Sequence, residues 1–294
     1  MSALEGLRKK INVAEDLHSI VKTMKSLAMI NIRHYEKAVA SLADYNRTIE
    51  MGLQALFKWN PELLFTNPKR FGGFSGAIIF GSDQGLCGRF NENIVEHALV
   101  ALDDFGYQIE DLHIVSVGER VHNLLNEAGG VVEKAYHVPA SLTGTTDLLQ
   151  KVLLDIEAWQ TQRGIGRVLL FYNHPLSAVA YHPQTTQLLP LDQAEMEELA
   201  SQTWPGSGFP IYNLERDRMY SRLIRQYLFV TLYRAIAESA ASENASRLAT
   251  LQSSEKNIEE SLERLNTQFH QQRQDAITDE LLDIVAGFEI LAKN

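Results

Sequence analysis

The chain has 294 residues, enough for one or two domains with a sizeable core, and its composition is that of a soluble globular protein. Its formal net charge of −10 argues against a general nucleic-acid-binding protein, because neutralising phosphates requires an excess of Lys and Arg. A single cysteine, Cys87, excludes an internal disulfide or a CxxC pair and favours a reducing compartment. No targeting segment and no apolar run of about 18 residues is visible, so direct membrane insertion is not expected.

Both ends of the chain are predicted to be very long helices. Glycine and proline are absent between Gly6 and Gly52, which predicts a helix over residues 1–58. After Pro210 there is no proline and no glycine before Gly287, which predicts a second helix over residues 211–294. Helices far longer than the usual ~10 to 14 residues are generally stabilised by pairing. We therefore expect an antiparallel two-helix coiled coil; the alternative is two amphipathic helices packed on an ordinary core.

The seam of this coiled coil is readable in the second helix. A seven-residue repeat there, interrupted by Glu255 and Gln272, places apolar residues at a and d: Leu248, Leu251, Ile258, Leu262, Leu265 and Phe269. The apolar residues of the first helix drift around it instead of holding one heptad register: Leu4, Leu7, Ile11, Ala14, Leu17, Val21, Met24 and Ala28.

Residues 74–200 are predicted to form an α/β domain inserted between the helices. Buried strands are indicated at residues 75–83, 112–118, 130–138 and 167–173, and helices at 92–105, 119–128 and 147–162. This alternation predicts a Rossmann-like α/β layer with a largely parallel sheet. Residues 177–191 alternate like an edge hairpin, and residues 203–213 form a turn-rich linker.

Catalytic and cofactor motifs are not found. The stretch "GSDQGLCG" follows a strand and precedes a helix but lacks the GK[ST] of a P-loop and the spacing of GxGxxG. Cys87 within it is interpreted as a small buried residue in a tight turn. His174 and His182, each followed by proline, are interpreted as turn residues, and no histidine pair has metal-ligand spacing. We expect no catalytic site, cofactor or metal in this chain.

Four segments carry the pattern of one known family. "INVAEDLHSIVKTMKSLAM" (residues 11–29) is similar to its N-terminal helix, and "SDQGLCGRFN" (82–91) to its SDRGLCGGLN. "ENASRLATLQSSEKN" (243–257) and "RQDAITDELLDIVAG" (273–287) are similar to E-x-A-x-R-M-x-A-M-x-x-A-x-x-N and R-Q-A-x-I-T-x-E-L-x-E-I-V-x-G. The chain thus resembles the gamma subunit of the F-type ATP synthase, the central-stalk rotor.

Several positions depart from the family pattern. Gln84 replaces Arg, Arg89 replaces the second Gly of a pair, Asp275 replaces Ala and Asp283 replaces Glu. The negative net charge of this chain also differs from the positive net charge expected for gamma subunits of the family. These departures suggest a divergent branch, such as the second bacterial ATPase called N-ATPase.

The resemblance implies that the apolar C-terminal tip turns inside a bearing of alternating alpha and beta subunits. The bearing residues would be Ile277, Leu281, Ile284, Val285 and Phe288, although packing on the N-terminal helix is an alternative for some of them. The family motifs further imply directional coupling contacts at Arg247, Gln274, Thr278 and Glu280, with Met24 opposite them on the first helix. The α/β domain would contact the epsilon subunit and the membrane ring of c subunits. A peripheral location on the cytoplasmic side of a bacterial inner membrane would follow.

The implied function is conformational coupling: an asymmetric shaft makes equivalent beta sites differ in nucleotide affinity. One alternative is a coiled-coil scaffold with an α/β module that binds a small ligand. A second alternative, a standalone α/β enzyme with helical additions, is disfavoured by the missing catalytic constellation.

Overall fold

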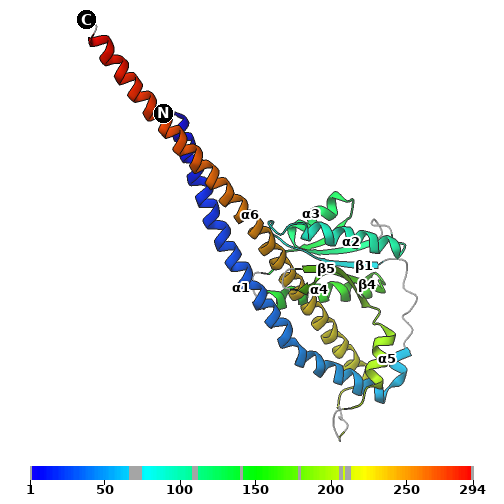
Figure 1. Ribbon diagram of the computed structural model, residues 1–294. Helices are drawn as coiled ribbons and strands as arrows, with labels where there is room; N and C mark the ends of the chain where they lie inside the picture. Colours follow the sequence, from blue (N-terminus) through cyan, green and yellow to red (C-terminus); the bar gives the residue numbers. More distant parts are fainter. Residues whose placement is uncertain are drawn as a thin grey trace. The chain divides into compact units, whose positions relative to one another are not determined.

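The computed structural model describes residues 2–65, 75–107, 112–139, 142–177, 180–204, 208 and 213–292. Its contacts divide the chain into two compact units. The coiled-coil unit consists of Met1–Ala28 and Leu248–Asn294, and the α/β unit of Met29–Arg247. Each of the two long helices (Figure 1) belongs partly to one unit and partly to the other. The predicted domains 1–58, 74–200 and 211–294 follow helices and strands instead of these units, and they stay a prediction.

The two predicted long helices are present. Helix α1 covers Ser2–Trp59 and helix α6 covers Arg216–Ala292, each far longer than an average helix. In the coiled-coil unit they run antiparallel, as the pairing of Lys25 with Glu255 and of His18 with Glu259 requires. Before Arg247, however, α6 packs on an ordinary core through Leu228, Leu232 and Ile236. Both interpretations of the long helices therefore hold, each for a different part of α6.

The seam of α6 is confirmed, whereas the predicted drift of α1 is wrong. Leu251 is fully buried and Ile258, Leu262, Leu265 and Phe269 are half-buried. Between residues 4 and 28 of α1, the buried and half-buried positions other than Met24 hold one heptad register: Leu4, Leu7, Ile11, Ala14, His18, Val21, Lys25 and Ala28. Leu17 is 48% exposed and does not belong to the seam. The register was hidden because two seam positions of α1 carry polar side chains that face glutamates of α6.

The α/β unit contains one five-stranded sheet in the order β3-β2-β1-β4-β5. Strands β1 (Ser75–Phe80), β2 (Leu112–Val117), β3 (Val132–Tyr136) and β4 (Arg167–Ser177) are parallel. Strand β5 (Ala180–Leu189) pairs antiparallel with β4 at the edge, so the predicted edge hairpin is present but consists of β4 and β5 instead of lying within residues 177–191. The predicted α/β class with a largely parallel sheet is confirmed.

Helices cover both faces of this sheet (Figure 1). Helices α2 (Phe90–Asp104) and α3 (Glu119–Glu127) pack on the face that carries Ala77 and Ile79. Helix α4 (Leu142–Gln162) and part of α6 pack on the opposite face, which carries Ile78 and Phe80. Successive residues of β1 thus enter different cores, because side chains alternate across a strand.

A third apolar cluster joins α1, α6 and α5 (Gln193–Ser201), near the short 3₁₀ helix η1 (Pro61–Phe65). The sequence patterns did not predict α5, which is short and begins with Asp192 accepting a hydrogen bond from the Ala194 amide. Most of the predicted linker, residues 205–207 and 209–212, lies outside the described residues.

The interpretation of His174 and His182 as turn residues is wrong. His174 lies in β4 and His182 in β5, where they are direct cross-strand partners with ring centroids 5.3 Å apart. The prolines that follow them are tolerated because β4 and β5 form the hairpin at the edge of the sheet, where missing ladder hydrogen bonds cost least.

Replacing Gly118 by alanine is expected to lower the free energy of unfolding by at least about 2 kcal/mol. Gly118 has a φ of 115°, and a Cβ there would lie 2.7 Å from the backbone nitrogen of Ser82, which cannot move away. Gly129→Ala is the matched control, because Gly129 also has a positive φ (86°) but no described atom within 4 Å of the added Cβ. Urea denaturation should show the larger loss for Gly118→Ala; equal losses would contradict the proposed collision.

Candidate functional site

The C-terminal part of α6 carries an apolar surface that the described residues do not cover. Every described side chain from Ile277 onward is exposed. Of the predicted bearing residues, Ile277 is 47% exposed, and Leu281, Ile284 and Val285 are 54–58% exposed. These four therefore do not pack on α1, and Leu282, at 61%, joins them. The side chain of Phe288 lies outside the described residues, although its backbone belongs to α6.

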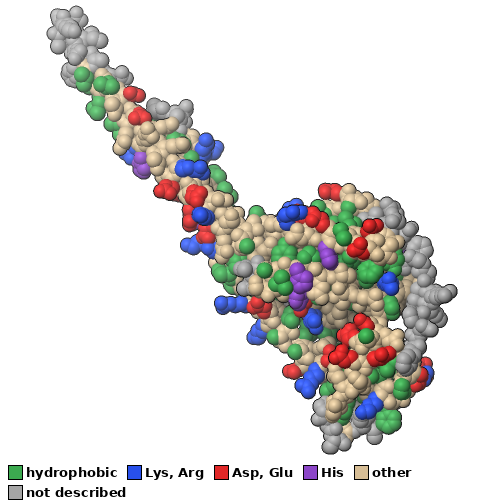
Figure 2. Space-filling view, turned by 45° about the vertical axis from the view of Figure 1, so that its right-hand side comes forward, with side chains coloured by type: hydrophobic (Ala, Val, Ile, Leu, Met, Phe, Trp, Pro, Cys, Tyr) green, Lys and Arg blue, Asp and Glu red, His purple; other side chains and the backbone are tan. Residues whose placement is uncertain are grey.

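Helix α1 carries a second apolar surface that the sequence patterns missed. Val13, Leu17, Ile20 and Leu27 are 48–56% exposed and are spaced four, three and seven residues apart along the helix. Met24, half-buried, falls in the same heptad row. The sequence did contain a sign of this second surface. The apolar positions of α1 seemed to drift around the helix because they belong to two separate rows, one that faces α6 and one that faces solvent. Figure 2 shows apolar side chains at the surface of this unit, among mixed charges.

We call these two sets the apolar surface of the coiled-coil unit. It consists of Val13, Leu17, Ile20 and Leu27 on α1 and of Ile277, Leu281, Leu282, Ile284 and Val285 on α6. Large exposed apolar sets on a polar helix pair indicate a binding surface for another protein.

The predicted coupling residues of α6 lie on the same end of the helix. Gln274, Thr278 and Glu280 are all exposed, and the Thr278 hydroxyl donates to the carbonyl of Gln274 at 2.9 Å. Met24 does not lie opposite them. Its neighbour Lys25 pairs with Glu255, roughly five helical turns before Gln274.

Arg247 differs from the other predicted coupling residues because it is buried. Its guanidinium donates to the Glu243 carboxylate at 2.5 Å and to the carbonyls of Gln84 and Gly85 at 3.3–3.4 Å. One turn of α6 thereby holds the loop that follows β1. Ser246 adds a 2.6 Å hydrogen bond from its hydroxyl to the carbonyl of Cys87 in the same loop.

This loop occupies the place where open α/β sheets usually bind ligands. In the sheet, β2 lies on one side of β1 and β4 on the other. The strand order therefore reverses between β1 and β4, and ligands of open α/β sheets usually bind at the carboxyl ends of the two strands at such a reversal. Ser82 and Cys87 are buried there, and Asn91 of α2 bonds both the amide and the hydroxyl of Ser82. The interpretation of Cys87 as a buried turn residue is confirmed. Ser246 and Arg247 therefore bond α6 directly to the backbone of this loop.

The electrostatics of this contact are dominated by burial. Burial raises the pKa of the Glu243 carboxyl, and the adjacent Arg247 guanidinium opposes that rise. Burial likewise raises the pKa of the Cys87 thiol, which keeps it protonated and unreactive near neutral pH. The contact thus joins α6 to the loop after β1 through a buried pair of a carboxyl and a guanidinium group.

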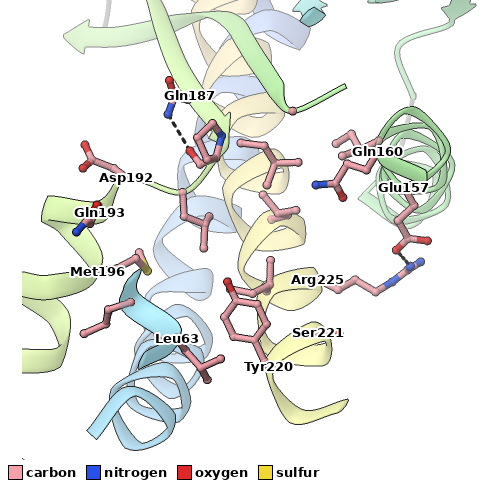
Figure 3. A pocket seen from close by; sticks show the side chains of 18 of the residues that line it. Leu63, Glu157, Gln160, Gln187, Asp192, Gln193, Met196, Tyr220, Ser221 and Arg225 are labelled. Atoms are coloured by element: carbon pink, nitrogen blue, oxygen red, sulfur yellow. Dashed lines mark hydrogen bonds and ion pairs between the residues drawn. The ribbon is translucent and has the colours of Figure 1, made fainter. Parts of the chain in front are cut away.

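A cavity of about 990 Å³ lies elsewhere in the α/β unit (Figure 3). It is bounded by α4, α5, η1 and α6, with Leu63 and Met196 on one side and the Glu157–Arg225 ion pair between α4 and α6 on the other. Gly166, just before β4, and Pro190, just after β5, also line it. The cavity thus lies at the amino ends of the parallel strands, opposite the edge where α/β folds usually bind nucleotides.

None of the described helices is both long enough and apolar enough to span a bilayer.

Comparison with known proteins identifies the family. A family described as ATP synthase matches residues 3–291. The gamma chains of ATP synthase from Geotalea uraniireducens and Pelagibacter ubique are 28% and 25% identical to this chain, with 98–99% of it and 99–100% of each relative aligned.

Solved structures agree on the fold. A chain of the Euglena gracilis mitochondrial ATP synthase, from the structure that contains the c-ring in rotational state 3, superposes with a TM-score of 0.69 at 16% identity, covering 99% of this chain and 95% of that one. A chain of the rotor of the same enzyme in rotational state 1 gives a TM-score of 0.66. Because the family match covers nearly the whole sequence and the architecture is the same, the chain belongs to the ATP synthase gamma chain family, the central-stalk subunits of F-type ATP synthases.

Proposed function

We propose that this chain is the shaft that turns inside a hexamer of alternating alpha and beta subunits, with its apolar surface as the bearing. The observation that carries the proposal is the exposure of nine large apolar side chains on the two helices of the coiled-coil unit. Left in water, such a surface would promote aggregation, whereas a surrounding protein would bury it.

An apolar surface also suits rotation. The hydrophobic effect has no preferred direction, whereas a set of specific hydrogen bonds would favour one angle over the others. An apolar bearing can therefore bind the shaft without fixing it at one angle. Asymmetry in the shaft would then make the three beta sites differ in nucleotide affinity, and turning the shaft would exchange their states.

Directional contacts to the beta subunits are assigned to Gln274, Thr278 and Glu280. All three side chains are exposed on the part of α6 that carries the bearing residues. Arg247 receives a different role in this proposal, because its donors already face Glu243 and the loop after β1. Arg247 would position that loop, and Met24 would belong to the bearing row of α1.

The α/β unit would form the foot of the shaft, in contact with the epsilon subunit and the ring of c subunits. Its network at the carboxyl ends of β1 and β4 supports a rigid module more than a ligand-binding one. Attachment through the ring would place the chain at the cytoplasmic side of a bacterial inner membrane, as a peripheral protein.

Native mass spectrometry of this chain coexpressed with the alpha and beta subunits of its own organism tests the proposal. We expect a complex of three alpha, three beta and one copy of this chain. The variant Leu17→Gln/Ile20→Gln should lower the amount of this complex, because it places two amides in the bearing. The control Asp16→Asn changes an exposed residue of the same helix and should leave the amount of complex unchanged. A well-folded chain that stays monomeric and binds a nucleotide saturably would instead support the ligand-binding scaffold.

A further inference from the structure

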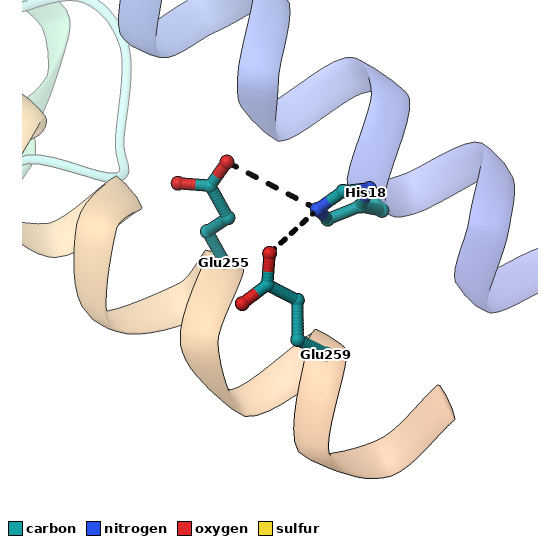
Figure 4. Close-up of side chains that lie close together, drawn as sticks. All are labelled: His18, Glu255 and Glu259. Atoms are coloured by element: carbon teal, nitrogen blue, oxygen red, sulfur yellow. Dashed lines mark hydrogen bonds and ion pairs between the residues drawn. The ribbon is translucent and has the colours of Figure 1, made fainter. Parts of the chain in front are cut away.

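The polar layer in the seam of the coiled-coil unit brings together three metal-ligating side chains (Figure 4). His18 points from α1 toward α6, where Glu255 and Glu259 lie one turn apart. The His18 Nε2 lies 3.2 Å from Oε1 of Glu259 and 4.0 Å from Oε1 of Glu255. The candidate ligand atoms of the three residues all lie within 4.8 Å of one another.

The two separations measured from His18 Nε2 are close to those that a zinc ion requires, and the carboxylate oxygens of Glu255 and Glu259 lie within 4.8 Å of each other. Zinc binds imidazole nitrogen and carboxylate oxygen at about 2.0–2.2 Å, so neighbouring ligand atoms in a tetrahedral site lie about 3.4 Å apart. The contact between His18 and Glu259 already meets this spacing, and the contact between His18 and Glu255 needs a closure of about half an ångström, which a glutamate rotamer can supply. One imidazole and two carboxylates form a ligand set that suits zinc and its neighbours among the first-row divalent ions.

A further interaction orients one ligand. Lys25 bonds Oε2 of Glu255, which leaves Oε1 of the same carboxylate directed at His18. The Glu255 side chain is 15% exposed and the His18 side chain 29% exposed, so the layer is partly shielded while an ion can still reach it.

We propose that His18, Glu255 and Glu259 form a three-ligand site for a divalent transition-metal ion of the zinc class, which clips α1 to α6. Water would complete the coordination on the open side, where Glu259 is 59% exposed. The site has one ligand from α1 and two from α6, so the bound ion would oppose separation of the helices. The proposal concerns residues of the coiled-coil unit alone and is independent of the assignment of the bearing.

The experiment is calorimetric titration of the full-length chain with Zn²⁺ in a non-chelating buffer. We expect one equivalent to bind, and we expect a higher melting temperature in its presence, because a ligand that binds only the folded state stabilises it. His18→Gln and Glu259→Gln should each weaken that binding at least about tenfold and remove most of the thermal shift. The imidazole resonance of His18, assigned by its absence in His18→Gln, should shift on addition of Zn²⁺.

Matched controls separate this site from adventitious binding. His270→Gln removes an exposed histidine of α6, and Glu260→Gln removes an exposed carboxylate next to Glu259; both should bind Zn²⁺ like the unmodified chain. Helix content measured by circular dichroism should be the same in all four variants. Binding that is unchanged in His18→Gln, or a complete lack of binding below the millimolar range, would overturn the proposal and leave His18 as a hydrogen-bond partner of Glu259 only.

Discussion

A chain shortened to end at Ala276 is expected to fold and yet to assemble poorly with the alpha and beta subunits. The deletion removes five of the nine apolar side chains of the proposed bearing: Ile277, Leu281, Leu282, Ile284 and Val285. Full burial of such a side chain stabilises by about 1.5–3 kcal/mol, and these are already close to half covered by their own helix. Even after the costs of association, the complex should weaken by at least about tenfold. Native mass spectrometry and ATP turnover of the purified complex measure the effect.

The substituted chain Leu281→Gln/Leu282→Gln/Ile284→Gln is the matched control for this deletion, because it keeps the length of α6 while removing apolar surface. It should reproduce most of the loss if burial is the cause. The sheet of the α/β unit should be unaffected in both variants, since its two cores contain no described residue beyond Ile236. Loss of the sheet signal in the far-ultraviolet circular dichroism of the shortened chain would refute this division of roles.

Replacing Arg247 by methionine is expected to destabilise the α/β unit by about 3–5 kcal/mol, because it leaves the buried Glu243 carboxylate without its partner. The loss should depend on pH. Burial raises the folded-state pKa of Glu243 and Arg247 opposes that rise, so the variant's pKa is higher still. A carboxyl group whose pKa is higher in the folded than in the unfolded state stabilises the folded state at low pH. This stabilisation is lost as the pH rises through the folded-state pKa. The deficit should therefore be largest at neutral pH and should shrink on acidification.

The double variant Glu243→Gln/Arg247→Met separates charge from packing. It removes the unpaired carboxylate, so it should recover a substantial part of the stability that Arg247→Met loses and should show little pH dependence from this site. Denaturant titrations at two pH values measure both effects. If Arg247→Met lowers ATP turnover of the assembled complex while stability is unchanged, Arg247 contacts the beta subunits directly and the positioning role is wrong.

Local patterns in the sequence were sufficient for most of the architecture. The absence of glycine and proline over long stretches predicted α1 and α6, because those residues are what interrupts helices. Short apolar runs bounded by glycine predicted the four parallel strands, and the motif around residues 273–287 led to the family. The start of one helix was predicted too late: α4 begins at Leu142 and not at Asp147, since the terminal turns of a helix carry few local signals.

By itself, then, the sequence determined the long helices, the α/β class, the family and the apolar C-terminal tip, since each depends on residues that are near one another in the chain. Tertiary structure decided which row of α1 faces α6, because two apolar rows on one helix are equivalent until a partner more than 200 residues away covers one of them. It also decided that Arg247 is buried against the loop after β1, that His174 and His182 pair across two strands, and that His18 meets two glutamates. These are long-range contacts, and their geometry is set only when the packed elements bring the side chains together.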